Sequence, residues 1–236
     1  MTVDVIIPQY GRPELTMRCV QTIREHSGDV NVVLVENGSE NIFDRAVVVD
    51  PPTLRIDLGT NIGYGRASNV GAAASTAEFL MFLNNDTEVH AGWLEPLVAA
   101  MDDPGIGAVA GRLENPDGTL QHAGVTLFWD QQGILTAQNI TEEQPAHEPD
   151  CLAGTALLVR RMAWVMIGGY DPIFRNGYED VDLCLRLRSA GWRLWFTPES
   201  TVMHHQHASG ASRWTPVNEN IALLHNRWSE RLQPAS

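Results

Sequence analysis

Short apolar runs alternate with segments of helical period over the first hundred residues. The runs VDVIIP, NVVLVE and FLMFL are short, rich in branched or aromatic residues and followed by polar or turn-forming residues, as is typical of buried strands. Pro13 stands where a helix would begin, and apolar residues recur at helical spacing after it. The pattern predicts strands at residues 3–8, 31–36, 54–58 and 79–83, with helices at 13–26 and 63–76. Because strand and helix alternate, we expect a mostly parallel central sheet flanked by helices.

The second half of the chain has a different pattern. A strand at 106–113, the turn sequence NPDG and a returning strand at 120–128 predict a small antiparallel sheet. Residues 129–150 contain few apolar residues, and we interpret them as a mobile surface loop. We expect further strands at 151–159 and 192–196, a short helix ending at 167, and helices at 180–190 and 217–232. Since no repeat or linker interrupts the chain, we expect a single α/β domain over residues 1–236.

The amino-acid composition excludes several classes of function. The formal net charge is −13, and all 16 of the Lys and Arg positions are Arg. A Walker-type phosphate loop, a Schiff-base enzyme and a protein kinase each need a lysine, and the acidic balance argues against nucleic acid as a partner. Cys19, Cys151 and Cys184 match neither a disulfide framework nor a metal spacing. With no membrane-length apolar run and no leader-like start, we expect a cytoplasmic protein with at most peripheral membrane contact.

Polar side chains follow each predicted strand of the first half. In an open parallel sheet, ligands bind beyond the carboxyl ends of the strands, so these clusters should face one crevice. Any one cluster could be an ordinary polar loop, but four in register favour a binding site. No GxGxxG sequence follows the first strand, so a dinucleotide site has no support. The clusters are Gln9, Tyr10 and Arg12, then Glu36, Asn37 and Ser39, then residues 61–66, then residues 84–88.

The sequence NNDTE follows the apolar strand at 79–83. Asn84 and Asn85 are good turn formers, so a plain turn is one interpretation. The other is that Asp86 holds a hard divalent cation, which commonly takes one or two carboxylates and completes its shell with substrate phosphates. In that case the two asparagines could orient ribose or sugar hydroxyls.

Three carboxylates stand at the start of the helix in NGYEDVDLCLRLRSAGW. Acids are favoured there without any function, because the free N–H groups and the helix dipole stabilise them. Asp180, however, shares its stripe with apolar residues and should face protein or a cleft. Asp182 is expected to pair with Arg186 one turn later, on a more polar face. We therefore take Asp180 as the candidate general base, with Glu179 next.

Three histidines follow the last predicted strand. Alternation would put His205 and His207 on one face and His204 on the other. A zinc site is not supported, because no Cys or third spaced ligand accompanies them. One histidine could complete a metal shell of carboxylate and phosphate oxygens, while at least one is expected to be a plain surface or core residue.

The order and spacing of these motifs resemble the family 2 glycosyltransferases of GT-A fold, a Rossmann-like architecture, and especially their rhamnosyltransferase-like branch. The resemblance covers nearly the whole chain. It implies that residues 1–100 bind a nucleotide diphosphate sugar and that residues 101–236 bind the acceptor and carry the base. The matching stretches are VIIPQYGRPE, VENGS, NIGYGRASNVG, FLNNDTEV, GTALLVRR, GGYDPIFRNGYEDVDLCLRLRSAGW and PESTVMHH.

The resemblance also implies roles for single residues. Asp180, with Glu179, would be catalytic, and Asp86 and His204 would bind Mg²⁺ or Mn²⁺. Glu36 stands where the family usually has Asp, and Asn84 replaces the first acid of its D-x-D motif. The implied nucleotide-sugar residues are Pro8, Tyr10, Arg12, Glu36, Asn61, Gly63, Arg66, Asn69, Asn84 and Asn85, with Arg66 able to reach a phosphate. The implied acceptor residues are Gly154, Tyr178 and Trp214.

Together these roles imply an inverting, metal-dependent transfer of a sugar from a UDP- or dTDP-linked donor. The acceptor would be a hydroxyl of a glycan, a lipid-carried acceptor or a natural product, and a homodimer is left open. The alternative is a glycosyltransferase-like domain that only binds sugar nucleotides or glycans, which the missing first acid favours. A nucleotidyltransferase is disfavoured, because such enzymes use a Gly-rich signature and a lysine. Trp192, Trp195 and Trp214 could form a sugar-stacking wall or belong to the core.

Overall fold

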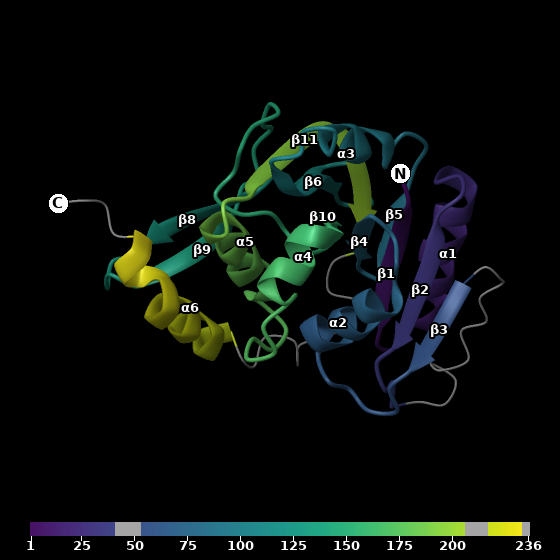
Figure 1. The fold of residues 1–236 in the computed structure, drawn as a ribbon, viewed down its shortest axis with the longest axis horizontal. Helices are drawn as coiled ribbons and strands as arrows, with labels where there is room; N and C mark the ends of the chain where they lie inside the picture. The colour runs from purple at the N-terminus through teal and green to yellow at the C-terminus, as the bar shows by residue number, and fades with distance from the viewer. Residues whose placement is uncertain (41–52, 206–216, 233–236) are drawn as a thin grey trace.

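The computed structural model describes residues 1–40, 53–205 and 217–232 of the chain (Figure 1). In the first half, strands and helices alternate as the apolar pattern predicts. The strands are β1 (Val3–Gln9), β2 (Asn31–Glu36), β3 (Thr53–Asp57), β4 (Phe79–Leu83) and β5 (Thr87–Val89). The helices are α1 (Pro13–His26), α2 (Tyr64–Ala74) and α3 (Glu95–Ala100).

The strands β3, β2, β1 and β4 lie side by side and run parallel. Every residue of β1 and of β4 is buried, because α1 packs on one face of this sheet and α2 on the other. Strands covered on both faces have continuous apolar sequences rather than alternating ones. This burial explains why VDVIIP and FLMFL could be recognised from the sequence.

The second half continues the same sheet. Its strands are β6 (Ile106–Glu114), β7 (Leu120–His122), β8 (Val125–Trp129), β9 (Leu135–Asn139), β10 (Ala156–Arg160) and β11 (Arg193–His204), and its helices are α4 (Arg161–Ile167), α5 (Glu179–Ser189) and α6 (Val217–Leu232). β10 pairs antiparallel with β4 on one side and with β6 on the other. The strand order is β3-β2-β1-β4-β10-β6-β11-β5, so the predicted α/β class is confirmed, with a sheet that is parallel in its first half and mixed in its second.

Two expectations for the second half were wrong. Residues 120–128 do not form one returning strand, because Gly124 at φ 113° separates β7, which pairs with β6, from β8. Residues 129–150 are not simply a loop, because they contain β9, which pairs antiparallel with β8 in a small second sheet. Only the first residue of β9 is buried, so the strand lacks the apolar alternation that identifies strands in a sequence.

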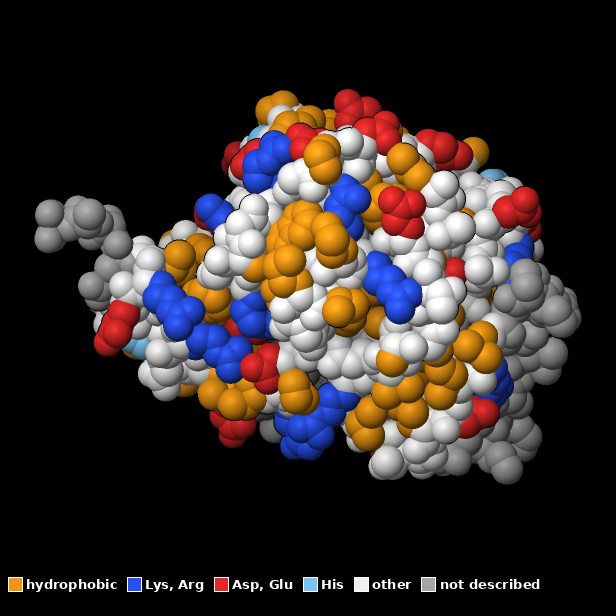
Figure 2. Space-filling model, in the orientation of Figure 1, with side chains coloured by type: hydrophobic (Ala, Val, Ile, Leu, Met, Phe, Trp, Pro, Cys, Tyr) orange, Lys and Arg blue, Asp and Glu red, His pale blue; other side chains and the backbone are white. Residues whose placement is uncertain are grey.

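Helix α4 is apolar on two faces. Inward, Trp164 packs on Phe82 at a ring-centroid distance of 4.4 Å and on Tyr170 at 5.1 Å. Outward, Met162 and Val165 are 60% and 65% exposed, and apolar side chains gather over α4 near the centre of the face shown in Figure 2. None of the helices in the described part of the chain is long and apolar enough to cross a membrane.

Asp182 ties α5 to α6. Its carboxylate accepts hydrogen bonds from Arg186 Nε at 2.7 Å, Arg227 at 2.9 Å and the Trp228 indole at 3.0 Å. The expected pair with Arg186 is therefore present, but Asp182 is fully buried instead of lying on a polar face. A buried carboxylate with three donors therefore holds α6 against α5, the helix that carries Asp180 in its first turn.

We expect Asp182→Ala to destabilise the protein by about 2 to 3 kcal/mol, because it removes the shared acceptor of two arginines and an indole. Urea unfolding followed by tryptophan fluorescence measures this change. Asp102→Ala, at an exposed position, is the matched control and should change the free energy of unfolding by less than about 0.5 kcal/mol. Equal stabilities for the two variants would contradict this role of Asp182.

Candidate active site

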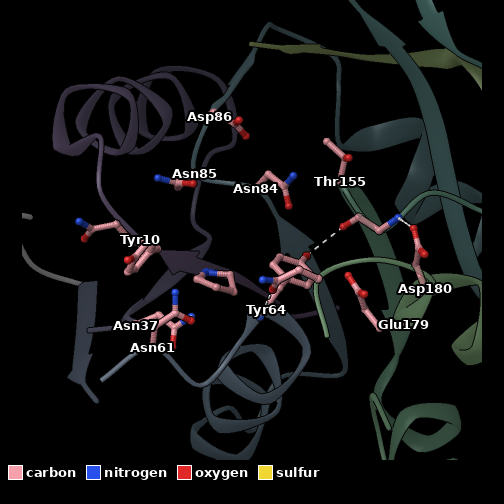
Figure 3. A pocket seen from close by; sticks show the side chains of 14 residues that line it. Tyr10, Asn37, Asn61, Tyr64, Asn84, Asn85, Asp86, Thr155, Glu179 and Asp180 are labelled. Atoms are coloured by element: carbon pink, nitrogen blue, oxygen red, sulfur yellow. Dashed lines mark hydrogen bonds between the residues drawn. The ribbon is translucent and has the colours of Figure 1, made fainter. Parts of the chain in front are cut away.

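A cleft opens at the carboxyl ends of β1, β2 and β4, opposite the start of α5 (Figure 3). Residues at the ends of the four parallel strands β1 to β4 and in the segments after them line one side, and the segment before β10 and the turn that leads into α5 line the other. The lining residues are Pro8, Gln9, Tyr10, Asn37, Asn61, Tyr64, Asn84, Asn85, Asp86, Gly154, Thr155, Asn176, Glu179 and Asp180.

Most of the predicted site residues therefore meet in one cleft. Gln9, Asn37 and Tyr64 belonged to the polar strand-end clusters that were expected to face one crevice. Thr155 and Asn176 were missed altogether. Thr155 lies beside β4 only because β10 pairs there, its carbonyl accepting the Asn84 N–H at 2.9 Å, and no local signal reveals such a long-range pairing. Asn176 precedes a glycine, a turn signal that could have pointed to it.

One end of the cleft is built from interlocked loops. The Asn37 side chain accepts the Ile62 N–H at 2.9 Å and donates to Asn61 Oδ1 at 3.2 Å. Gly38, at φ 71°, allows this approach, since a Cβ there would lie 2.1 Å from the carbonyl carbon of Thr60. The chain needs glycine at this position because the loops after β2 and β3 touch through their backbones.

Glu36 supports this end of the cleft without lining it. Its carboxylate is 1% exposed and accepts the Ser39 N–H at 2.6 Å and the Ser39 hydroxyl at 3.1 Å. Tyr10, in contrast, lines the cleft and donates its hydroxyl to Glu40 at 3.1 Å. Partial burial and the Glu40 carboxylate raise the pKa of Tyr10, so its hydroxyl stays a donor at neutral pH.

Asp86 and His204 form a buried pair at another corner. They are 4% and 3% exposed, and His204 Nε2 lies 3.2 Å from Asp86 Oδ1. Within the described residues, this nitrogen has no hydrogen-bond partner, although it is fully buried. A buried polar atom without a partner is costly. Adjacent ligands of an octahedral Mg²⁺ or Mn²⁺ lie about 3 Å apart, so the separation of the two atoms fits a shared cation.

No third His, Cys, Asp or Glu joins this pair in the part of the chain that the structure describes. Such a site leaves several coordination positions for phosphate oxygens and water, as is usual for Mg²⁺. The residues present therefore fit a cation that binds together with a phosphate-bearing ligand, and they do not fit a closed structural metal site.

The neighbouring histidine faces outward. His205 Nε2 lies 2.8 Å from Glu88, which also accepts a hydrogen bond from Arg18 at 2.9 Å. Although burial opposes it, these two partners lower the pKa of Glu88. Alternation along β11 correctly separated His204 from His205 but could not say which one faces inward. His207 lies outside the described residues.

Asp180 faces the cleft from the first turn of α5. Its Oδ2 accepts the Gly154 N–H at 2.8 Å, and the Gly154 carbonyl accepts the Tyr64 hydroxyl at 3.0 Å (Figure 3). Burial, together with the nearby Glu179 and Asp180 carboxylates, raises the pKa of Tyr64, so the hydroxyl remains protonated. These contacts hold one oxygen of Asp180 against the loop before β10.

The turn before α5 has an unusual backbone. Arg12, Asn176 and Tyr178 are the only non-glycine residues in the described ranges with positive φ. Asn176 Oδ1 accepts the Tyr64 N–H at 3.2 Å, and the Asn220 side chain of α6 donates to the carbonyls of Arg175 and Gly177 at 2.8 Å each. Strained backbone of this kind is concentrated at functional sites, and here it lies at the edge of the cleft.

Several predicted residues lie outside the cleft. Arg66 is exposed and donates to the Pro172 carbonyl at 3.1 and 3.3 Å, while Asn69 bonds both the N–H and the carbonyl of Tyr170. The Tyr178 hydroxyl lies 2.9 Å from Thr136 Oγ1 of β9. Gly63 and Arg12 precede α2 and α1. Trp214 is outside the described residues.

Comparison with known proteins gives the family. Residues 4–166 match the model described as glycosyl transferase family 2, so the chain belongs to that family, and the predicted resemblance is confirmed. The chain is 32% identical over 210 residues to N-acetylglucosaminyl-diphospho-decaprenol L-rhamnosyltransferase of Mycobacterium tuberculosis, covering 77% of this chain and 68% of that enzyme. It is 31% identical to O-antigen biosynthesis protein RfbC of Myxococcus xanthus, covering 88% of this chain but only 17% of that protein.

Solved structures share the fold. GalNAc-T7, solved with UDP, GalNAc and Mn²⁺, superposes with a TM-score of 0.71 at 20% identity, over 86% of this chain and 44% of that one. The mannosyltransferase PcManGT from Pyrobaculum calidifontis, solved with GDP-Man and Mn²⁺, gives 0.69 at 16% identity, over 99% of this chain and 65% of that one. At such identities the likeness shows the fold alone, which is the GT-A architecture that the motifs implied.

We expect Gly154→Ala to displace Asp180, since a Cβ at this position would lie 3.0 Å from the Asp180 Cβ. A misplaced catalytic group slows a reaction steeply, so the rate of sugar transfer should fall about tenfold or more. Steady-state kinetics measure the rate, and thermal unfolding checks that the fold is kept. A variant with full activity would show that the contact between Gly154 and Asp180 does not position the carboxylate.

Proposed function

We propose that the chain is an inverting, metal-dependent glycosyltransferase that moves a sugar from a nucleotide diphosphate sugar to an acceptor hydroxyl. Family membership supports transfer of a sugar, and the chemistry of the cleft supports the finer description. Residues 1–100 would bind the donor, while residues 101–236 would supply the base and most of the acceptor side.

The observation that carries this proposal is that one cleft holds two acidic corners, Asp86 and Asp180, whose surroundings differ. Asp86 lies beside the buried His204, whose Nε2 is 3.2 Å from Asp86 Oδ1 and has no hydrogen-bond partner among the described residues, an arrangement that suits a cation. Asp180 is oriented by a backbone N–H and comes from a different element. Transfer from a sugar nucleotide needs one group that neutralises the departing diphosphate and another that takes a proton from the nucleophile. A cation on Asp86 and His204 would do the first, and Asp180 would do the second.

Asp180 is the proposed general base. One of its oxygens is held by Gly154, and the carboxylate heads a helix whose N-terminus stabilises the ionised form. It would accept the proton of the acceptor hydroxyl as that oxygen attacks the anomeric carbon from the face opposite the nucleotide, which inverts the configuration. Glu179, which is 8% exposed and accepts the Gly177 N–H, would help to hold this turn.

Asp86 Oδ1 and His204 Nε2 are the proposed ligands of Mg²⁺ or Mn²⁺. The cation, when bound there, would act as a Lewis acid that stabilises the leaving diphosphate. The Mn²⁺ present in the structures of GalNAc-T7 and PcManGT supports this choice. Asn84 and Asn85 line the cleft next to Asp86 and would bind hydroxyls of the donor.

The donor base would lie at the opposite end, among Pro8, Tyr10, Asn37 and Asn61, and we propose a UDP- or dTDP-linked donor. The name of the Mycobacterium tuberculosis relative supports a lipid-carried acceptor. A glycan or a small-molecule acceptor is the alternative within the same reaction.

Asp180→Asn should lower the rate of transfer about 10²- to 10⁴-fold, because the amide keeps the shape of the carboxylate but cannot accept the proton. Affinity for the nucleoside diphosphate should change little, as measured by isothermal titration calorimetry. Asp171→Asn, a change that removes a carboxylate paired with Arg227, is the matched control and should keep most of the activity. A fully active Asp180→Asn variant would rule out this base.

Chelation should abolish transfer, and Mn²⁺ or Mg²⁺ should restore it. A thermal-shift screen of UDP, dTDP and GDP, each with Mn²⁺, should identify the base by the largest increase in melting temperature, because ligands that bind the folded state stabilise it. In Asp86→Asn the nucleotide-induced shift should lose its dependence on Mn²⁺. Undiminished turnover in excess EDTA would remove Asp86 and His204 from the proposed role.

A further inference from the structure

The second ring nitrogen of His204 ends a chain of hydrogen bonds that starts in the turn after β6. His204 Nδ1 lies 2.7 Å from Gln121 Oε1 of β7. The Gln121 amide donates to Asn115 Oδ1 at 2.9 Å and to the His204 carbonyl at 3.1 Å. Asn115 donates to the Thr119 hydroxyl at 3.0 Å, and Thr119 donates to the Asp117 carboxylate.

The direction of donation along this chain is fixed at both ends. Hydrogen bonds from Thr119 hold the pKa of Asp117 below its ordinary value, so its carboxylate is ionised and can only accept. Thr119 must then donate to Asp117 and accept from Asn115. At the other end, the His204 carbonyl can only accept, so the NH₂ group of Gln121 faces it. Reversing the Gln121 amide would set its oxygen against that carbonyl.

With its NH₂ group so placed, Gln121 presents an oxygen to His204 Nδ1. This oxygen can only accept, so Nδ1 must carry the proton. In the neutral ring, Nε2 is then unprotonated, and it is this nitrogen that lies 3.2 Å from Asp86 Oδ1. An unprotonated imidazole nitrogen is the form that binds a metal ion, and a hydrogen bond at the other nitrogen commonly sets it.

We propose that Gln121 is a positioning residue that keeps the proton of His204 on Nδ1 and so makes Nε2 a ready ligand atom beside Asp86. The inference rests on the metal role proposed above and adds a residue that does not touch the cation. Gln121 is 7% exposed and His204 3%, so water does not compete freely for these contacts. Asn84 stands where the family motif has an acid. The tautomer of His204 therefore matters more for binding the cation in this chain.

The test uses metal-free protein labelled with ¹⁵N. Long-range ¹H–¹⁵N spectra report the tautomer of each of the eight histidines, and His204→Gln assigns the signal. At a pH where the His204 ring is neutral, the wild type should show a single Nδ1–H tautomer for this residue. Gln121→Leu removes the acceptor opposite Nδ1 and should give a mixture of the two tautomers.

Binding of Mn²⁺ alone, followed by electron paramagnetic resonance, gives a second readout. Loss of such an outer partner typically lowers metal affinity about 10- to 100-fold, so Gln121→Leu should show a decrease of this size. The matched control is Gln21→Leu on the exposed face of α1, where the Gln21 amide donates to Glu25 at 2.8 Å. This variant should bind Mn²⁺ as the wild type does.

An Nε2–H tautomer in the wild type, or an unchanged tautomer in Gln121→Leu, would overturn the role of Gln121. The wild-type spectrum decides this even if the leucine variant fails to fold. If the tautomers behave as expected but the wild type does not bind Mn²⁺, the proposed metal site fails while the role of Gln121 in fixing the proton stands.

Discussion

The antiparallel pairing of β10 with β4 is the contact on which the candidate site depends. It joins the parallel first half to the mixed second half in one sheet. It also sets the exit of β4, with Asn84 and Asp86, beside the segment that enters β10, where the Thr155 carbonyl accepts the Asn84 N–H. Gly154, the residue before Thr155, donates its backbone N–H to Asp180 Oδ2 and so links this segment to α5. The two acidic corners thus belong to one rigid frame, although nearly a hundred residues separate them.

Structure elsewhere in the chain holds this frame without touching the cleft. Asp182 fastens α6 to α5, and Asn220 of α6 secures the turn with positive φ that leads into Asp180. Trp164 of α4 packs on Phe82 and Tyr170, behind Gly154. Active-site geometry must be held closely for catalysis, and here buried polar contacts and aromatic packing outside the cleft supply that rigidity.

The sequence revealed those features whose signal is local. The elements β1, α1, β2 and β4 follow from apolar runs and helical spacing, and Asp180 follows from an acid that heads an apolar stripe. Features that depend on contacts between segments far apart in the sequence could not be predicted from it. Thr155 lines the cleft because of β10, and β9 exists because β8 lies beside it. Glu36 supports a loop because Ser39 turns back onto it, and Arg66 is held by the Pro172 carbonyl.

The histidines show the same limit. Alternation placed His204 and His205 on opposite faces, and the family motif favoured His204 as the ligand. Only the path of β11, which pairs with β5 at Thr87, decides that His204 faces inward beside Asp86. The partner that orients it, Gln121, lies 83 residues away in sequence, so its contact with the ring could be found only in the folded chain.

The most direct measurement is an anomalous-scattering map from crystals grown with Mn²⁺ and the nucleoside diphosphate that stabilises the protein most. The account predicts one manganese peak within bonding distance of both Asp86 Oδ1 and His204 Nε2, with the diphosphate completing the shell and the base near Tyr10 and Asn37. Manganese bound elsewhere, or a nucleotide outside this cleft, would contradict it.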